Sequence, residues 1–197
     1  MAVMGEDSDE SLLADFIGGS EQAFEQLVRR YEVTLLNFLY RYLRDTQEAE
    51  EVFQEAFIRV YTKARRFDPG RKFKTWLYTI ALNLAKTSLK RRRAAPLLAR
   101  EDATGGERDK IILEGEASED DSPEKQLETS EIGELVKDAV KSLPERQQEV
   151  FMLFQYQGLN YAEIAAVLDR PLGTIKSQMH YAVLALREKL RESYPRA

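Results

Sequence analysis

The sequence loses its regular pattern of apolar residues between Ala94 and Ser130, and this interruption constrains the fold more than any other feature. The segment is rich in Glu, Asp, Gly, Ser and Ala. Such a composition cannot bury enough apolar area to offset the entropy lost when a chain becomes ordered. We therefore expect a flexible acidic linker over 94–130, which joins an N-terminal domain, 1–93, to a C-terminal domain, 131–197.

The N-terminal domain is predicted to be a helical bundle. Apolar residues recur at helical spacing over 11–89, and neither strand-like alternation nor a hairpin turn competes with that pattern. The expected helix boundaries are marked by glycines, N-cap residues and a breaker cluster. These markers are Gly18-Gly19, Ser20, Asp45 and Phe67-Asp68-Pro69-Gly70. The last helix of the domain is expected to start near Lys74.

The C-terminal domain is predicted to end in a helix-turn-helix. Two helices separated by 142–144 come first, and Asn160 with Glu163 then forms a capping box that begins a short third helix. Residues 169–173 make the turn, and a last helix is expected to open at Thr174. The fold class is therefore all-α, with two small helical domains.

The last helix is expected to leave one face of its first turns polar. Its apolar residues share a stripe, namely Ile175, Met179, Ala182, Leu186 and Leu190. In DNA-binding proteins of this type the start of the second helix enters the major groove. The candidate DNA contacts are Thr174, Lys176, Ser177, Gln178, His180 and Tyr181. The alternative is that the two helices merely pack together, as in many other proteins, and that His180 is only solvated.

Charge is strongly segregated along the chain, although the net charge is only −5. Residues 59–93 hold twelve Lys and Arg against a single acid, a net +11, whereas residues 101–134 have a net charge of −10. Residues 170–191, which include Arg170, have a net charge of +4. An acidic protein can thus present a surface that binds a polyanion.

The basic segment also carries aromatic residues. Cations follow a phosphate backbone while aromatic faces stack on exposed bases, so this mixture favours a separated DNA strand over an intact duplex. The candidate residues are Phe67, Arg71, Lys72, Phe73, Lys74, Trp76 and Asn83. Trp76 has the spacing of a core residue, and this spacing favours a place in the core over a contact with DNA. Phe67 and Phe73 flank a Pro-Gly turn, where burial is less assured, so they are the better stacking candidates.

Several classes of protein are disfavoured by composition. The chain has no cysteine and a single histidine, so neither a metal centre nor a cofactor is expected. No apolar run reaches the roughly 20 residues that cross a bilayer. The acidic first residues lack the pattern of a secretory signal, and a cytoplasmic location is expected.

Four segments resemble the extracytoplasmic-function group of RNA polymerase sigma factors. They are DTQEAEEVFQEAFIRVY (45–61), FKTWLYTIALNLAK (73–86), LPERQQEVFMLFQYQGLNYAEIAAVL (143–168) and GTIKSQMH (173–180). The resemblance implies that 1–93 corresponds to sigma region 2, which binds the clamp helices of the largest polymerase subunit and melts the minus-ten element. It implies that 131–197 corresponds to region 4, which docks on the polymerase flap and reads the minus-thirty-five element. Core polymerase, duplex and single-stranded promoter DNA, and an anti-sigma protein are the implied partners.

The resemblance also assigns residues. It implies that Glu50, Glu51, Gln54, Glu55 and Phe57 bind polymerase. It implies that the loop 67–74 captures a flipped minus-ten base, with Asn83 at the matching polar position of the next helix. Family members commonly have arginine where this chain has Gln178 and Tyr181, so phosphate anchoring is expected to be weaker and the preferred promoter unusual.

Two other functions compete with this interpretation. A stand-alone helix-turn-helix repressor or activator explains 160–190 but not the basic aromatic segment or the long linker. A nuclease that uses Glu48, Glu51 and Glu55 to hold a divalent ion has no accompanying His or Asp array.

Overall fold

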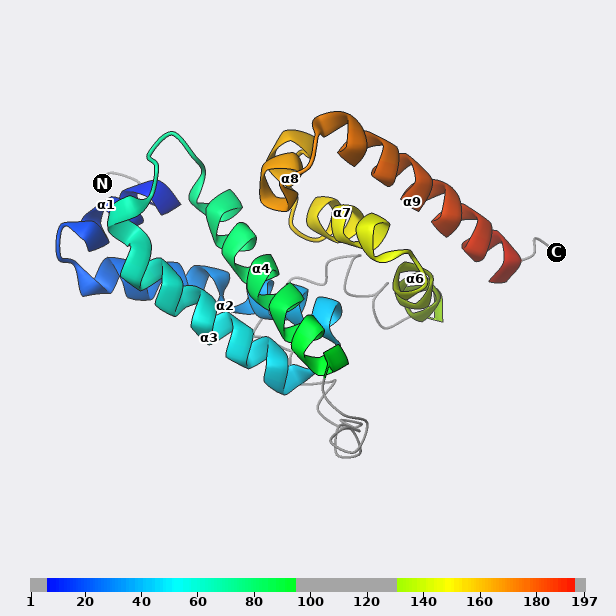
Figure 1. The fold of residues 1–197 in the computed structure, drawn as a ribbon, viewed down its shortest axis with the longest axis horizontal. Coiled ribbons are helices and arrows are strands. Elements are labelled where there is room, and N and C mark those ends of the chain that lie inside the picture. Colours follow the sequence, from blue (N-terminus) through cyan, green and yellow to red (C-terminus); the bar gives the residue numbers. More distant parts are fainter. Residues whose placement is uncertain (1–6, 95–130, 194–197) are drawn as a thin grey trace, which may run out of the picture. The chain divides into compact units, whose positions relative to one another are not determined.

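The computed structural model describes residues 7–94 and 131–193, and the described residues contain helices and no strand. The helices fall into two compact units, α1–α4 and α6–α9 (Figure 1). The prediction of an all-α fold with two helical domains is confirmed. The expected linker lies outside the described residues, apart from Ala94 at the end of α4.

The first unit is built from two long antiparallel helices, α2 and α3, with α1 and α4 packed against them (Figure 1). Its elements are α1 (Asp9–Ile17), α2 (Glu21–Leu43), α3 (Thr46–Lys63), a short 3-10 turn (Ala64–Arg66) and α4 (Phe73–Ala94). The predicted N-caps are confirmed: Ser20 accepts a hydrogen bond from the Ala23 N–H at 3.3 Å, and Asp45 accepts one from the Glu48 N–H at 2.9 Å.

The core of this unit lies where α2 meets α4. Leu35 and Phe38 of α2 are completely buried, as are Leu77 and Tyr78 of α4, and the Phe38 and Tyr78 rings meet edge to face. Burial raises the pKa of the Tyr78 hydroxyl, because the charged phenolate would lose its hydration there. Tight packing of this kind fixes the orientation of α4, and thereby the loop that precedes it.

Helix α1 anchors the start of α4. Glu10 accepts a hydrogen bond from the Phe73 N–H at 2.8 Å, so a carboxylate from α1 caps a helix that begins 63 residues later. The neighbouring Asp9 pairs with Arg30 at 2.7 Å and accepts a hydrogen bond from the Tyr31 hydroxyl. Burial, followed by this bond to Asp9, raises the pKa of Tyr31. Helices α1, α2 and α4 are thus joined at one end of the bundle.

Replacing Glu10 by Ala is expected to lower the free energy of unfolding of this unit by about 1 kcal/mol, the usual cost of losing an N-cap. Urea unfolding followed by the fluorescence of Trp76, the single tryptophan, measures it. Glu10→Gln is the matched control, because an amide oxygen still accepts the Phe73 N–H. Equal stability of the Ala and wild-type proteins would show that this cap contributes nothing.

The second unit packs three helices against one long helix. Its elements are α6 (Glu131–Lys141), α7 (Glu145–Gln155), α8 (Tyr161–Leu168) and α9 (Leu172–Ser193), and α9 contacts each of the others (Figure 1). The predicted capping box is confirmed: Glu163 accepts from the Asn160 N–H at 2.8 Å, and Asn160 accepts from the Glu163 N–H at 3.0 Å.

The turn between α8 and α9 is shorter than predicted. Asp169 ends α8 in the left-handed conformation, with φ of 50°, and α9 begins at Leu172 instead of Thr174. The reason is that the Pro171 carbonyl already accepts hydrogen bonds from the N–H groups of Thr174 and Ile175, at 2.9 and 3.2 Å. Proline preceding the first helical residue thus opens the helix early.

Candidate nucleic-acid interface

The first turns of α9 present a polar face above a buried apolar stripe. Ile175, Met179, Ala182 and Leu186 are buried as predicted, and Leu190 is half-buried. Among the candidate contacts, Lys176, Ser177, His180 and Tyr181 are exposed, whereas Thr174 and Gln178 are half-buried. The Ser177 hydroxyl donates to the Gly173 carbonyl at 3.0 Å, which leaves its oxygen able to accept. The surface is therefore polar and accessible where a helix-turn-helix needs it.

Tyr181 is a large exposed side chain on this face, with 59% of its area accessible. Its ring meets that of His180 at a centroid distance of 5.7 Å. The two rings meet edge to face, at 64°, and together form a partly apolar surface on the same exposed part of α9. Such a surface can pack against a thymine methyl group or a deoxyribose, contacts that an arginine at position 181 would not make in the same way.

Sequence reasoning missed a buried ion pair beneath this helix. Arg170 in the turn binds Glu149 of α7 at 2.5 Å, and the Glu149 side chain is only 1% exposed. The second terminal nitrogen of Arg170 donates to the side-chain oxygen of Gln178 at 3.2 Å. Arg170 contributes to the net charge of +4 over 170–191, but its guanidinium is neutralised internally by Glu149. A buried acid opposite a turn arginine could not be identified without the packing.

Of the two aromatic residues predicted to be available for stacking in the loop before α4, one is buried. Phe73 is completely buried and its ring meets Tyr31 at 5.6 Å, so the prediction that it is available for stacking is wrong. The physical reason is its place at the first turn of α4, where the cap from Glu10 fixes its backbone. Phe67 is half-buried and rests against Trp76, with ring centroids 5.1 Å apart.

The cations of this loop are accessible. Arg71 and Lys72 are exposed, and Lys74 is half-buried. Asn83, farther along α4, is also exposed. Asp68 shapes the loop by accepting the Gly70 N–H at 2.9 Å, and its other oxygen lies 3.6 Å from Arg71. Both partners of that ion pair are largely solvated, so it contributes little and leaves Arg71 available for a phosphate.

Helix α3 presents the acids that the sequence assigned to polymerase. Glu50, Glu51 and Gln54 are exposed, while the half-buried Glu55 binds Arg59 at 2.9 Å. Phe57 is only 5% exposed and packs between α2 and α3, where its ring centroid lies 6.1 Å from that of Phe24.

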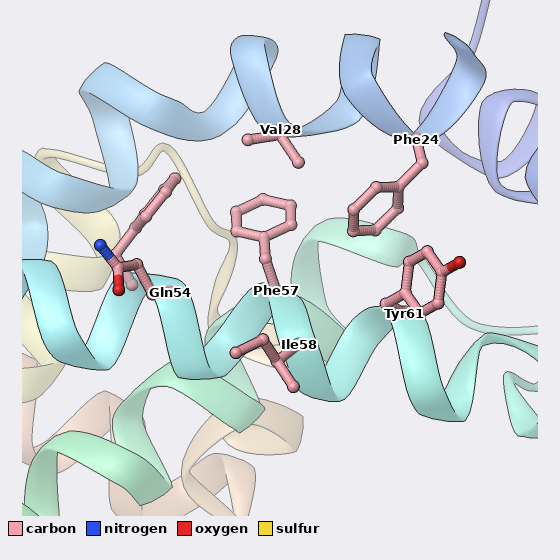
Figure 2. A pocket seen from close by; sticks show the side chains of 7 residues that line it. Phe24, Val28, Gln54, Phe57, Ile58 and Tyr61 are labelled. Atoms are coloured by element: carbon pink, nitrogen blue, oxygen red, sulfur yellow. The ribbon is translucent and has the colours of Figure 1, made fainter. Parts of the chain in front are cut away.

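An apolar groove runs between α2 and α3 beside these acids (Figure 2). It has a volume of about 420 Å³ and was not predicted. Its lining residues are Phe24, Val28, Phe53, Gln54, Phe57, Ile58 and Tyr61. The sequence did contain a signal, because Ile58 and Tyr61 are large apolar residues outside the buried stripe of α3, with 56% and 48% of their areas accessible.

The acids of α3 do not form a metal site. Glu48 lies 3.5 Å from Arg92, and Glu55 binds Arg59. Within residues 7–94 and 131–193 no group of three or more His, Cys, Asp or Glu side chains could hold an ion. Among these same residues, no helix combines the length and the apolar character needed to span a bilayer.

Comparisons with known proteins match both units. Residues 27–95 match the family Sigma-70 region 2, and residues 133–186 match Sigma-70, region 4. The chain is 33% identical to RNA polymerase sigma-H factor of Pseudomonas aeruginosa, over 96% of this chain and 97% of that protein. It is 32% identical to the ECF RNA polymerase sigma factor SigW of Bacillus subtilis, over 88% of this chain and 92% of that protein.

Solved structures show the same fold. CnrH, in complex with the cytosolic domain of CnrY, matches 94% of this chain and 99% of its own, with a TM-score of 0.66 and 22% identity. The sigma factor RpoE of Bartonella quintana, in complex with the anti-sigma factor NepR, matches 85% of this chain and 96% of its own, with a TM-score of 0.62 and 24% identity.

Proposed function

The chain belongs to the extracytoplasmic-function group of RNA polymerase sigma factors, and from this we propose that α9 reads the minus-thirty-five element as duplex while the loop before α4 opens the minus-ten element. Members of this family are transcription initiation factors and not catalysts, and the chain acts in promoter-specific initiation through RNA polymerase. Core polymerase and promoter DNA, double- and single-stranded, are its proposed partners, in the cytoplasm.

The exposed start of α9 carries the duplex-reading part of the proposal. Lys176, Ser177 and His180 stand on the accessible side of a helix whose other side is anchored by Ile175 and Met179. A major groove admits a helix of this kind, and donors and acceptors at its first turns then reach base edges and phosphates.

The loop before α4 supports the strand-opening part. Phe67 is half-buried beside the half-buried Trp76, and the exposed Arg71 and Lys72 follow it in the same loop. A base that has left the duplex stacks on such a face while the cations hold its phosphates. Asn83 supplies an exposed amide that can bind a base edge. With Phe73 in the core, Phe67 is the proposed stacking residue.

Helix α3 is the proposed contact for the clamp helices of polymerase. Its exposed acids suit a basic surface, and the groove at Ile58 and Tyr61 suits an apolar side chain from the same partner. The sigma factor RpoE of Bartonella quintana was solved in complex with the anti-sigma factor NepR. An anti-sigma protein is accordingly proposed as a regulator of this chain.

Charge reversal at Glu51 is expected to weaken association with core polymerase on the order of tenfold without unfolding the domain, because an exposed acid stabilises the fold little but contributes to charge complementarity. Pull-down of core polymerase at several concentrations of Glu51→Lys protein measures it. Asp15→Lys, an exposed acid on α1, is the matched control. Wild-type association of Glu51→Lys would place the polymerase surface elsewhere.

Replacing Lys176 by Ala is expected to weaken binding of the holoenzyme to a complete promoter by about 1 to 3 kcal/mol if Lys176 reads a base, and by less if it contacts only phosphate. On a promoter whose minus-ten region is already mismatched, the substitution should matter little. Gel-shift titration of both DNAs makes the comparison. Arg191→Ala, in the last turn of the same helix, is the control, and an equal loss there would show only general attraction to DNA.

A further inference from the structure

The amide of Gln178 has a fixed orientation in this structure. Its side-chain oxygen accepts a hydrogen bond from Nη1 of Arg170 at 3.2 Å. Arginine can only donate hydrogen bonds, so the atom that faces it must be the amide oxygen and not the nitrogen. The oxygen therefore points toward the turn, and the amide nitrogen, with its two N–H donors, is directed away from Arg170.

Arg170 is itself held in place by a buried acid of α7. Its Nη2 binds the buried carboxylate of Glu149 at 2.5 Å, and the Arg170 side chain is only 20% exposed. The planar guanidinium binds Glu149 with one terminal nitrogen and Gln178 with the other. Because the group is rigid, the position of Glu149 fixes the direction in which the second nitrogen donates to Gln178. Within the described residues, the side chain of Gln178 has no hydrogen bond other than this one.

From this geometry, and on the basis of the proposed function, we infer that Arg170 is a positioning residue that makes Gln178 read DNA as a hydrogen-bond donor only. A glutamine that recognises adenine uses both ends of its amide, the oxygen accepting from N6 and the nitrogen donating to N7. The oxygen of Gln178 points toward Arg170, so it cannot lie beside the amide nitrogen against one base edge. Gln178 therefore favours guanine, whose N7 and O6 both accept in the major groove, over adenine, where only N7 accepts.

The test is selection of promoter duplexes, randomised over the minus-thirty-five region, by holoenzyme assembled from core polymerase and the full-length chain. Gln178→Ala identifies the base pair that Gln178 reads, because the preference there is lost. We expect the wild-type protein to favour guanine over adenine at that pair. Gln178→Glu, whose carboxylate still accepts from Arg170 but cannot donate, should lose the guanine preference as well.

Two variants release the amide oxygen without leaving a charge unpaired. Arg170→Lys keeps a cation for Glu149 but lacks the second nitrogen of the fork, and the double variant Glu149→Leu, Arg170→Met replaces the ion pair by apolar groups, a change that folds often tolerate. In both, adenine should rise on the order of tenfold relative to guanine at the Gln178 base pair. Preferences that depend on Lys176 should stay unchanged, which a general loosening of the domain would not allow.

Three results would overturn the inference: a wild-type preference for adenine at that pair, an unchanged preference in both releasing variants, or an equal loss of affinity for all sequences in Gln178→Ala, which would mean a phosphate contact. A wild-type holoenzyme that selects no duplex sequence at all would instead contradict the proposed function.

Discussion

Replacing Arg170 by Met is expected to lower the free energy of unfolding of the α6–α9 unit by about 3 to 5 kcal/mol, because it removes the guanidinium that lies 2.5 Å from the buried carboxylate of Glu149. Glu149 is 1% exposed and cannot regain hydration without opening the packing around it. The loss is a large fraction of the stability of a small helical unit. Unfolding of this unit at moderate temperature would abolish promoter recognition through α9.

The two units can be followed separately in the intact chain. Trp76, the single tryptophan, lies in α4, so its fluorescence reports the first unit, whereas circular dichroism reports helices of both. In Arg170→Met part of the dichroism should be lost early while the tryptophan transition stays in place. The double variant Glu149→Leu, Arg170→Met should recover most of the loss, and Arg187→Met, an exposed arginine on α9, should cause almost none. A loss in Arg170→Met no larger than in Arg187→Met would show that the pair is not essential.

Replacing Phe67 by Leu is expected to slow promoter opening by about ten- to a hundredfold, since a base stacked on an aromatic face is worth about 1 to 3 kcal/mol. Leucine keeps the apolar contact with Trp76 but offers no aromatic face. Permanganate reactivity of unpaired thymines measures opening, and binding to the closed duplex should stay near wild type. Phe67→Tyr, which retains the ring, is the matched control.

The opposite pattern would be informative. If Phe67→Leu lost duplex binding and the remaining complexes opened normally, the loop would be a duplex contact, and the roles assigned to the two units would be reversed. Normal opening together with normal binding would mean that Phe67 only packs against Trp76 and Phe73.

Features set by neighbours in the sequence could be predicted. The N-caps at Ser20 and Asp45 and the capping box at Asn160 each depend on a partner three residues away. The buried stripe of α9 follows from helical period alone. These signals were sufficient for the all-α class, for the two-domain organisation and for the exposed face that carries Lys176 and His180.

Features set by distant partners could not be predicted. The burial of Phe73 depends on Glu10, 63 residues earlier. The internal use of Arg170 depends on Glu149, 21 residues earlier. Phe57 has the same sequence surroundings as an exposed contact residue, and only the packing of α2 against α3 shows it to be buried. In each case the sequence showed a charged or aromatic residue but did not show which distant residues contact it.

The central claim, that this chain confers promoter recognition on RNA polymerase, is tested most directly by measuring DNA binding and transcription with the chain alone, core polymerase alone and both together. The DNA is a promoter selected by the holoenzyme. The account predicts tight, specific binding, reactive thymines in the minus-ten region and a transcript of defined start only when both proteins are present. Specific binding of that duplex by the chain alone, unchanged by polymerase and without any transcript, would contradict the account and indicate a stand-alone repressor.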